Sequence, residues 1–295
     1  MADTQGQIDI RGIDVQKFLT GFADEDTILK GMCRQSTTSA REIRWFQKTA
    51  GYLAPATTTG ITTNLASNKG FGSMAPIANA SFTRNTSYVW KFSMKSEIIS
   101  LEDEADSDVD ILAVTLRDLL RGIASQVDTR IYNVMTESLS PSTINTVAAT
   151  DDGWDDAATG NPILDILKAK QLIRSYRYDI SSGGVLYINS IEERNLLNFL
   201  ISVKGSSIPQ LASQTVEGKR LMEILGLKVV VSENATTDYA LIFIEGVSCA
   251  WKQFMPLTSK VEEIVGVGKV VHVWEEGQAL LENPRSVCLI TDTVV

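Results

Sequence analysis

Apolar residues recur at helical spacing through the middle of the chain. Steps of one, three and four residues keep these positions on one face of a helix; they are Leu112, Leu116, Leu119, Leu120, Ile123, Val127, Ile131, Val134 and Met135. Ser107 and Asp110 precede this stripe in an S-x-x-D pattern that is typical of a helix N-terminus. The pattern predicts a helix over residues 107–136, roughly 42 Å long. Few globular helices reach that length, so we expect a strut.

Shorter helices and buried strands alternate in the next part of the chain. The expected elements are a helix over 161–177, a strand over 183–190, a helix over 190–202, a helix end and a strand over 221–234, and a strand over 238–246. Ser190 and Glu193 match a capping box at the second of these helices, and Gly226 is placed as the end of the last one. This alternation predicts an α/β domain.

The two ends of the chain have different patterns. Residues 1–42 predict an arm followed by a short helix near residues 24–32, which cannot build a core by itself. Residues 250–295 alternate in the manner of strands, with a hairpin turn at Gly266-Val267-Gly268.

A tract of 34 residues, Ala54 to Ser87, is dominated by Thr, Ser, Asn, Ala and Gly. A loop of that length inside a compact domain is either functional or disordered. Its threonines and the alternating segments on both sides, residues 41–47 and 87–98, favour a long two-stranded ribbon with Asn68-Lys69-Gly70 near the tip. Half the tract on each side would reach roughly 55 Å. Such a ribbon is marginal alone in water, so we expect it to lie on another surface.

Charges are sorted along the chain. Residues 43–96 carry six Lys or Arg and no carboxylate, whereas residues 97–110 carry seven carboxylates. The helix dipole accounts for the acids nearest the long helix, and accidental surface variation is the alternative for the rest. We expect instead that identical copies meet head to tail through opposite charges. The expected inter-subunit contact residues are Arg44, Lys48, Asn68, Lys69, Gly70, Arg84, Lys91, Lys95, Glu102, Asp103, Glu104 and Asp106.

Motifs for catalysis are missing from the sequence, so we expect no catalytic residue and no cofactor. The single histidine, His272, lies in a strand pattern, and no G-x-S-x-G motif accompanies it. The segment GVGKVV fails as a phosphate loop because Glu263 and Val270 stand where Gly and Ser or Thr are required. No G-x-G-x-x-G motif follows a strand.

The composition excludes other kinds of site. Asp106, Asp108 and Asp110 alternate as in a calcium loop, but Arg117 stands where that loop needs glutamate, so no metal site is expected. Cys33, Cys249 and Cys288 are expected to be buried thiols rather than a disulfide framework. A net charge of -9 argues against nucleic-acid recognition. With no signal sequence and no apolar run long enough to span a membrane, we expect a soluble protein made in a cytoplasm.

The order of these parts resembles the major capsid protein of tailed double-stranded DNA viruses, the Hong Kong 97-type fold that encapsulins share. The residues that carry the resemblance include GGVLYINSIEERNLLNFL, LGLKVVVSEN and VHVWEEGQALLENPRSVCLITD. The resemblance implies an α+β fold with an N-terminal arm, an extended loop (E-loop), a peripheral (P) domain with a spine helix, and an axial (A) domain. The implied division is an arm over 1–40, a P domain over 41–53, 97–145 and 249–284, an E-loop over 54–96, and an A domain over 146–248 and 285–295.

The resemblance also implies what the chain lacks. Cross-linking members of the family join a loop-tip lysine to an asparagine seven residues before a strand glutamate. Here Lys69 and Glu275 match the lysine and the glutamate, but Gly268 stands at the asparagine position. We therefore expect no covalent cross-linking between subunits. Because only about forty residues precede the expected fold, any scaffolding function is expected in a separate protein.

The function implied by the resemblance is structural and not enzymatic. We expect hexamers and pentamers of an icosahedral virion shell, assembled in the host cytoplasm, with portal and separate scaffolding or decoration proteins as partners. Packaged DNA would be contained without sequence-specific binding, and no membrane is involved. An encapsulin-like nanocompartment shell is one alternative, and a cytosolic α/β enzyme with a long lid is another.

Overall fold

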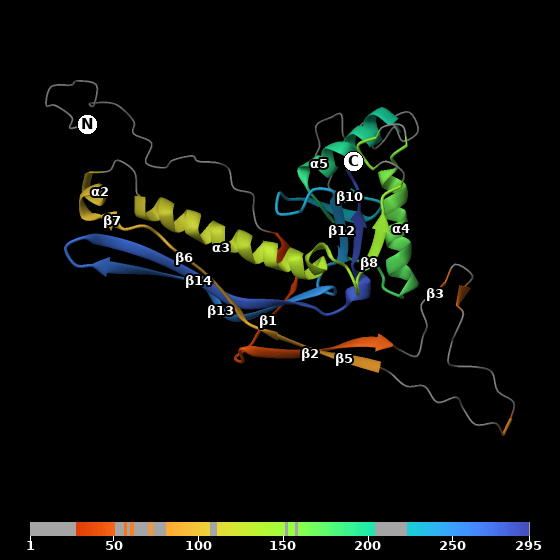
Figure 1. Ribbon diagram of the computed structural model, residues 1–295, viewed down its shortest axis with the longest axis horizontal. Helices are drawn as coiled ribbons and strands as arrows, with labels where there is room; N and C mark the ends of the chain where they lie inside the picture. Colours follow the sequence, from red (N-terminus) through yellow and green to blue (C-terminus); the bar gives the residue numbers. More distant parts are fainter. Residues whose placement is uncertain are drawn as a thin grey trace.

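The computed structural model describes residues 28–50, 56–57, 60–61, 71–72, 81–106, 111–150, 153–156, 159–203 and 223–294. A long helix and a hairpin sheet form an elongated half, and a compact half with a second sheet adjoins one end of it (Figure 1). The helices are α1 Leu29–Met32, α2 Leu101–Asp106, α3 Ile111–Met135, α4 Pro162–Ser175 and α5 Ser190–Asn198, with 3-10 turns η2 Glu137–Leu139 and η4 Pro284–Ser286 and a π-helical turn η3 Phe199–Val203.

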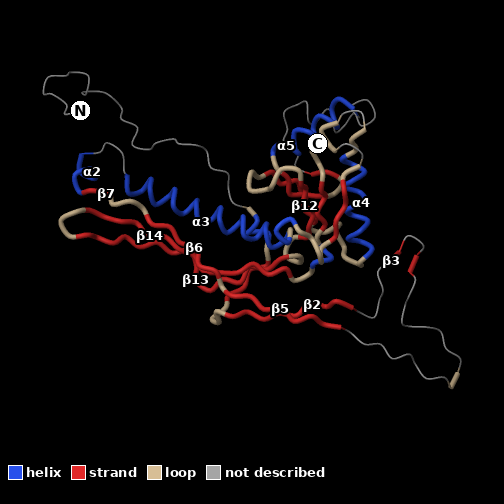
Figure 2. The backbone as a smooth tube through the Cα atoms, viewed as in Figure 1, coloured by secondary structure: helices blue, strands red, loops and turns tan. Residues whose placement is uncertain are grey.

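The strands fall into two large sheets and two small ones (Figure 2). They are β1 Arg34–Thr37, β2 Glu42–Ala50, β3 Ala56–Thr57, β4 Gly60–Ile61, β5 Ser81–Tyr88, β6 Trp90–Lys95, β7 Ile99–Ser100, β8 Asn145–Ala148, β9 Gly184–Ile188, β10 Glu223–Ile224, β11 Leu227–Val231, β12 Tyr239–Ile244, β13 Cys249–Ile264, β14 Gly268–Leu281 and β15 Cys288–Thr291.

The elongated half places α3 along one face of a five-stranded sheet of order β1-β13-β14-β6, with β7 paired to β14. The predicted stripe of α3 faces this sheet: five of its members are buried and the other four are partly buried against the same core. Val271 and Val273 of β14 and Trp251 of β13 supply the opposite side of that core. The 3.6-residue periodicity therefore predicted the buried face correctly.

The compact half is built on a six-stranded mixed sheet of order β10-β11-β9-β12-β15-β8. Alternate residues of its strands point to opposite faces. Leu186 and Ile242 join the core with α4 and α5, while Tyr187 and Phe243 join the core with α1 and the end of α3. The sheet thus belongs to both cores and fixes the position of α3 relative to the compact half.

A two-stranded ribbon runs outside both sheets. β2 pairs with β5 in an antiparallel register from Glu42↔Tyr88 to Ala50↔Ser81. A two-stranded ribbon is therefore present, but the strand that pairs with β2 lies within the Thr-rich tract itself and not in the predicted segment 87–98. One residue beyond β5, however, β6 leaves the ribbon and pairs with β14, with Trp90 opposite Gly277. The expected tip, Asn68 to Gly70, lies outside the described residues.

Two local predictions need correction. Asn189, not Ser190, is the N-cap of α5, because its extended backbone lets its side chain accept a hydrogen bond from the N–H of Ile191 at 3.1 Å. Gly226 does not end a helix: it follows Leu225 in the turn of the hairpin β10–β11, where both residues have positive φ.

The acidic stretch before the long helix has a helix of its own. Residues 101–106 form the short helix α2, which the hydrophobic pattern did not predict. The proposed capping pair Ser107 and Asp110 lies outside the described residues.

Within the described ranges, no helix combines the length and the apolar character that crossing a bilayer requires.

Candidate assembly surfaces

The ribbon β2–β5 has an inner face that is fixed to the rest of the chain. Ile43 is buried. The side chains of Trp45 and Gln47 both donate to the carbonyl oxygen of Leu281, at 3.3 Å and 2.6 Å. Gln278 donates to the hydroxyl of Ser87 at 2.8 Å. These bonds hold the ribbon base against the end of β14, so its orientation does not depend on a partner.

The opposite face of the ribbon is exposed along its described length. Because side chains alternate, it carries Glu42, Arg44, Phe46, Arg84, Thr86 and Tyr88. The ring of Phe46 is 66% exposed and that of Tyr88 is 64% exposed. Two large exposed rings among arginines are typical of a protein–protein contact rather than of a solvated strand. We call this set the outer ribbon face.

A second exposed apolar set lies at the far end of the hairpin β13–β14. Pairing of β7 with β14 brings residues before α2 next to the turn, and Leu101 donates its N–H to the carbonyl of Val267 at 3.3 Å. The side chains are Ile98, Leu101, Val261, Ile264, Val265 and Val267, with Val265 95% exposed. The sequence signal was an apolar run through a hairpin turn, where polar residues are usual. We call this set the hairpin tip.

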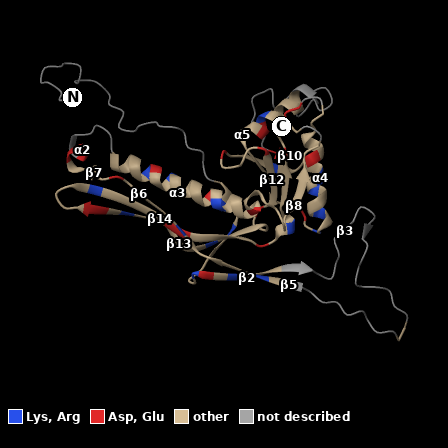
Figure 3. Cartoon of the chain, viewed as in Figure 1, with Lys and Arg blue, Asp and Glu red and all other residues tan. Residues whose placement is uncertain are grey.

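The acidic side chains of α2 lie beside the hairpin tip (Figure 3). Glu102, Asp103 and Glu104 occupy the first turn of α2, where the N–H groups of the helix favour negative charge. Ser100 caps this turn by accepting the N–H of Asp103 at 3.0 Å. Glu104 also pairs with Lys269 at 2.7 Å. The positive end of α2 therefore accounts for these three carboxylates, which lie too far before the long helix for its dipole to explain.

Several predicted contact residues have ionic partners inside the chain. Arg44 pairs with Glu42 at 2.6 Å, and Lys95 pairs with Glu262 at 3.3 Å. Lys91 lies 4.0 Å from Glu276. These pairs are exposed on the cation side, so they do not prevent contact with another copy, and such pairs contribute only ~0–1 kcal/mol.

The remaining predicted contact residues differ in how far they are described. Arg84, Glu102 and Asp103 are exposed. Lys48 lies in β2 and Asp106 lies in α2. Asn68, Lys69 and Gly70 at the expected tip lie outside the described residues. No inter-subunit contact is visible in a single chain, so the set stays a prediction.

The strand glutamate singled out in the sequence has a structural partner. Glu275 is buried, and its carboxylate pairs with Lys30 of α1 at 2.5 Å. Gly268 lies against β7: a Cβ at this position would be 2.0 Å from the carbonyl oxygen of Ile99. An asparagine side chain has no space here unless β7 moves. The chain therefore uses Glu275 to hold its own N-terminal segment and Gly268 to pack β7.

Comparisons with known proteins agree with this architecture. A family model described as phage capsid protein matches residues 95–271. The capsid of the native GTA particle is similar with a TM-score of 0.68 and 9% identity, covering 99% of each chain. A structure from Mycobacterium phage Che8 gives 0.65 and 14% identity, covering 95% of this chain and 97% of that one.

A further similar structure is a virus-like particle from Pyrococcus furiosus, with a TM-score of 0.55, 12% identity and coverage of 89% of this chain and 91% of that one. Comparison with curated proteins finds no match. Over nearly its full length this chain has the α+β capsid fold of the Hong Kong 97 type. Since the family model spans more than half of the sequence, the chain belongs to the phage capsid protein family, whose members build the virion shell and are not enzymes.

Proposed function

We propose that copies of this chain assemble into pentamers and hexamers of an icosahedral shell, and that the outer ribbon face docks on a neighbouring copy. The observation that carries the proposal is the difference between the two faces of β2–β5: the inner face is hydrogen-bonded to β14, whereas the outer face exposes Phe46 and Tyr88. Burying one such ring stabilises a contact by about 1.5–3 kcal/mol. The rings therefore outweigh the neighbouring ion pairs, at ~0–1 kcal/mol each.

The hairpin tip is the second docking surface in this proposal. The turn between β13 and β14, which carries these exposed aliphatic residues, lies at the opposite end of the elongated half from the compact half (Figure 1). A copy that is fixed through its ribbon at one end and through its tip at the other can contact different neighbours at once. Heterologous contacts of this kind close into rings and shells.

The shell is proposed to hold packaged double-stranded DNA without reading its sequence. A net charge of -9 leaves little positive surface to bind phosphates tightly. Portal and scaffolding or decoration functions would come from separate proteins. Without an asparagine at position 268, the proposed shell is held by non-covalent contacts alone.

Strand pairing suggests where the proposed domains meet. β2 and β5 form the ribbon, so the E-loop together with its base extends from Glu42 to Tyr88, while β6 pairs with β14 of the P domain. The A domain comprises the six-stranded sheet with α4 and α5, which includes β8 and β15 from either side of its long segment.

An encapsulin-like shell that stores an enzyme cargo is the second candidate, favoured by the likeness to the Pyrococcus furiosus virus-like particle. Small, uniform, empty shells formed by this chain without any viral partner would support it. The alternative of a cytosolic enzyme is set aside because the chain belongs to a capsid family.

Negative-stain micrographs and gel filtration of the full chain test the proposal. We expect shells or capsomers from the wild-type protein. The double variant Phe46→Ser with Tyr88→Ser should remain unassembled, with an unchanged circular dichroism spectrum because both rings are exposed. Thr86→Ser on the same face is the matched control and should assemble as the wild type does. A wild-type protein that stays monomeric, or a double variant that assembles normally, would contradict the proposal.

A further inference from the structure

Residues 28–38 form a segment that packs against the long helix and then joins the edge of the five-stranded sheet; we call it the strap. The N–H groups at the start of α1 donate to Asp128 of α3, and the carbonyl of Met32 accepts the N–H of Gly246 at 2.9 Å. β1 then pairs in parallel with β13 from Arg34↔Ala250 to Thr37↔Gln253. The strap is therefore docked by hydrogen bonds along its whole described length.

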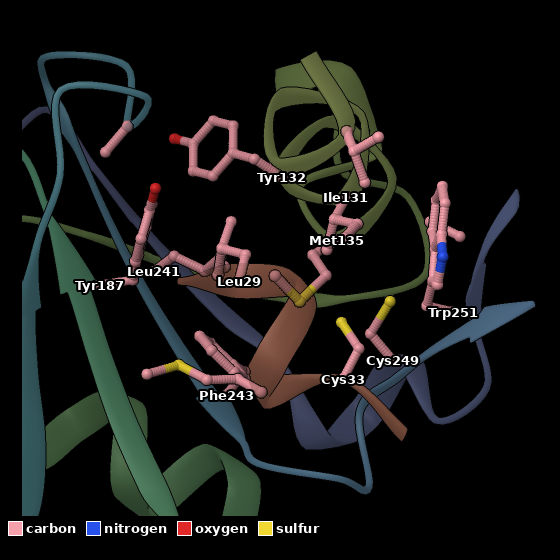
Figure 4. Packing of buried hydrophobic residues seen from close by; sticks show 14 of the residues in the cluster. Leu29, Cys33, Ile131, Tyr132, Met135, Tyr187, Leu241, Phe243, Cys249 and Trp251 are labelled. Atoms are coloured by element: carbon pink, nitrogen blue, oxygen red, sulfur yellow. The ribbon is translucent and has the colours of Figure 1, made fainter. Parts of the chain in front are cut away.

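Two of the three cysteines meet where the strap reaches the sheet. Cys33 directly precedes β1 and Cys249 is the first residue of β13, one position before the first paired residues. Cys33 has extended backbone angles, so the parallel register continues to it. Adjacent strands lie about 4.8 Å apart, and disulfide-bonded residues have Cα atoms about 4.4–6.8 Å apart. Figure 4 shows the two sulfur atoms side by side.

The surroundings of the pair are apolar and closed. Both thiols are buried in the core formed by α1, α3, β13 and β14. The neighbouring thiol of Cys33 and burial together raise the pKa of Cys249 well above its ordinary value. Because the thiolate is the reactive form, a thiol with a raised pKa reacts slowly with oxidants. The docked pair is therefore protected from oxidation. Cys288 in β15 is also buried, which raises its pKa to about 12, and it belongs to the other core.

We propose that Cys33 and Cys249 are a latent disulfide site, which a small-molecule disulfide such as oxidised glutathione converts into a covalent bond between the strap and the sheet. One protein thiolate attacks a sulfur of glutathione disulfide and expels a glutathione thiolate. The second protein thiolate then attacks the mixed disulfide and expels the other. Two electrons pass from the two cysteines to glutathione disulfide, and the two thiol protons end on two glutathione molecules.

The burial of the pair determines when the reaction occurs. The oxidant reaches the sulfur atoms only while the strap is undocked, and docking then shields the new bond from reductants. A chain made in a reducing cytoplasm would hold free thiols, and the bond would form after transfer to an oxidising environment. The bond would close a loop of more than two hundred residues and raise the Tm by roughly 5–10 °C. This inference rests on one copy of the chain and does not depend on the proposed shell.

The test uses unassembled full-length protein equilibrated in glutathione buffers from fully reducing to fully oxidising. Free thiols are then blocked by alkylation, and mass spectrometry maps the disulfides in a digest. We expect one intramolecular Cys33–Cys249 bond at oxidising ratios and the stated rise in Tm. Cys288→Ala is the matched control and should oxidise as the wild type does. Cys33→Ala should form no intramolecular disulfide.

A second variant keeps the test decisive if access to the thiols is slow. Asp128→Asn weakens the attachment of α1 without touching either cysteine, so the pair should oxidise on the order of tenfold faster. The proposal is overturned if both cysteines stay reduced at oxidising ratios in the wild type and in Asp128→Asn. A disulfide that joins two chains or uses Cys288 would overturn it equally.

Discussion

Asp128 of the long helix accepts a hydrogen bond from the backbone N–H of Leu29 at 3.0 Å, across 99 positions of sequence. Its other carboxylate oxygen accepts the N–H of Lys30, also at 3.0 Å. Both donors belong to the first turn of α1, which has no N-cap side chain of its own. A residue of one helix thus caps another helix and fixes the strap to the core.

Asp128→Ala should lower the free energy of unfolding by roughly 2–4 kcal/mol, because it leaves two N–H groups without an acceptor in a buried place. Denaturant unfolding of unassembled protein measures this loss. Asp118→Ala, at an exposed position of the same helix, is the control and should change stability by less than about 0.5 kcal/mol. Equal effects of the two substitutions would show that the cap contributes nothing.

The same carboxylate has a defined pH dependence. Burial raises the pKa of Asp128 above its ordinary value, although the N–H groups of the strap act in the opposite direction. Between the unfolded and folded pKa values, the native state binds more protons than the unfolded chain. The stabilisation that Asp128 contributes is therefore greatest at low pH, and it is lost as the pH rises through the pKa of Asp128 in the folded protein.

The Asp128→Asn variant has no ionisable group at this position. Comparing it with the wild type therefore isolates the pH dependence of Asp128. The stability advantage of the wild type over the variant should be larger at about pH 4 than at about pH 7. Unfolding curves at both values measure it, with Asp118→Asn as the matched control. An advantage that grows with pH would mean that hydrogen bonding to the ionised carboxylate outweighs its burial.

The long helix could be predicted because its signal is local. Apolar residues at steps of three and four define a buried face whatever lies opposite, and the buried residues of α3 follow that stripe. The same kind of pattern gave a wrong prediction at residues 223–226. Apolar spacing there suggested a helix, but the chain turns at Leu225 and Gly226, whose positive φ values suit a hairpin.

The attachments of the strap had no local signal. Asp128 was not part of the apolar stripe, and nothing in the sequence connects it with Leu29. The pairing of Lys30 with Glu275 joins residues 245 positions apart. Contacts between distant segments depend on strand register, which a single sequence does not give. For the same reason the partners of Lys95 and Glu104 were placed on another copy, although each has one within the chain.

Gly268→Ala should destabilise the hairpin end, since its Cβ would lie 2.0 Å from the carbonyl oxygen of Ile99 and β7 would have to move. We expect a loss of about 1–3 kcal/mol in the free energy of unfolding. Gly31→Ala is the control, because nothing lies within 4 Å of the added carbon and the position is helical. If Gly268→Ala proves as stable as Gly31→Ala, β7 does not depend on this close approach.

Charge reversal at the base of the ribbon separates contacts between copies from contacts within one. Lys95→Glu together with Lys91→Glu should slow assembly at low salt if these lysines meet carboxylates of a neighbouring copy, and the effect should shrink as salt is added. Light scattering follows the rate. The reversal also breaks the pair with Glu262, so a slower rate alone does not identify the partner.

A charge swap resolves this ambiguity. The variant Lys95→Glu with Glu262→Lys restores both the ion pair within the chain and the net charge. If Lys95 acts only on Glu262, the swapped protein should assemble at the wild-type rate. If its partners are Glu102 and Asp103 of another copy, the swapped protein should stay as slow as Lys95→Glu alone, because the lysine has moved from β6 to β13, on the other side of β14. We expect the second result, since both members of the pair are exposed and their mutual attraction is weak.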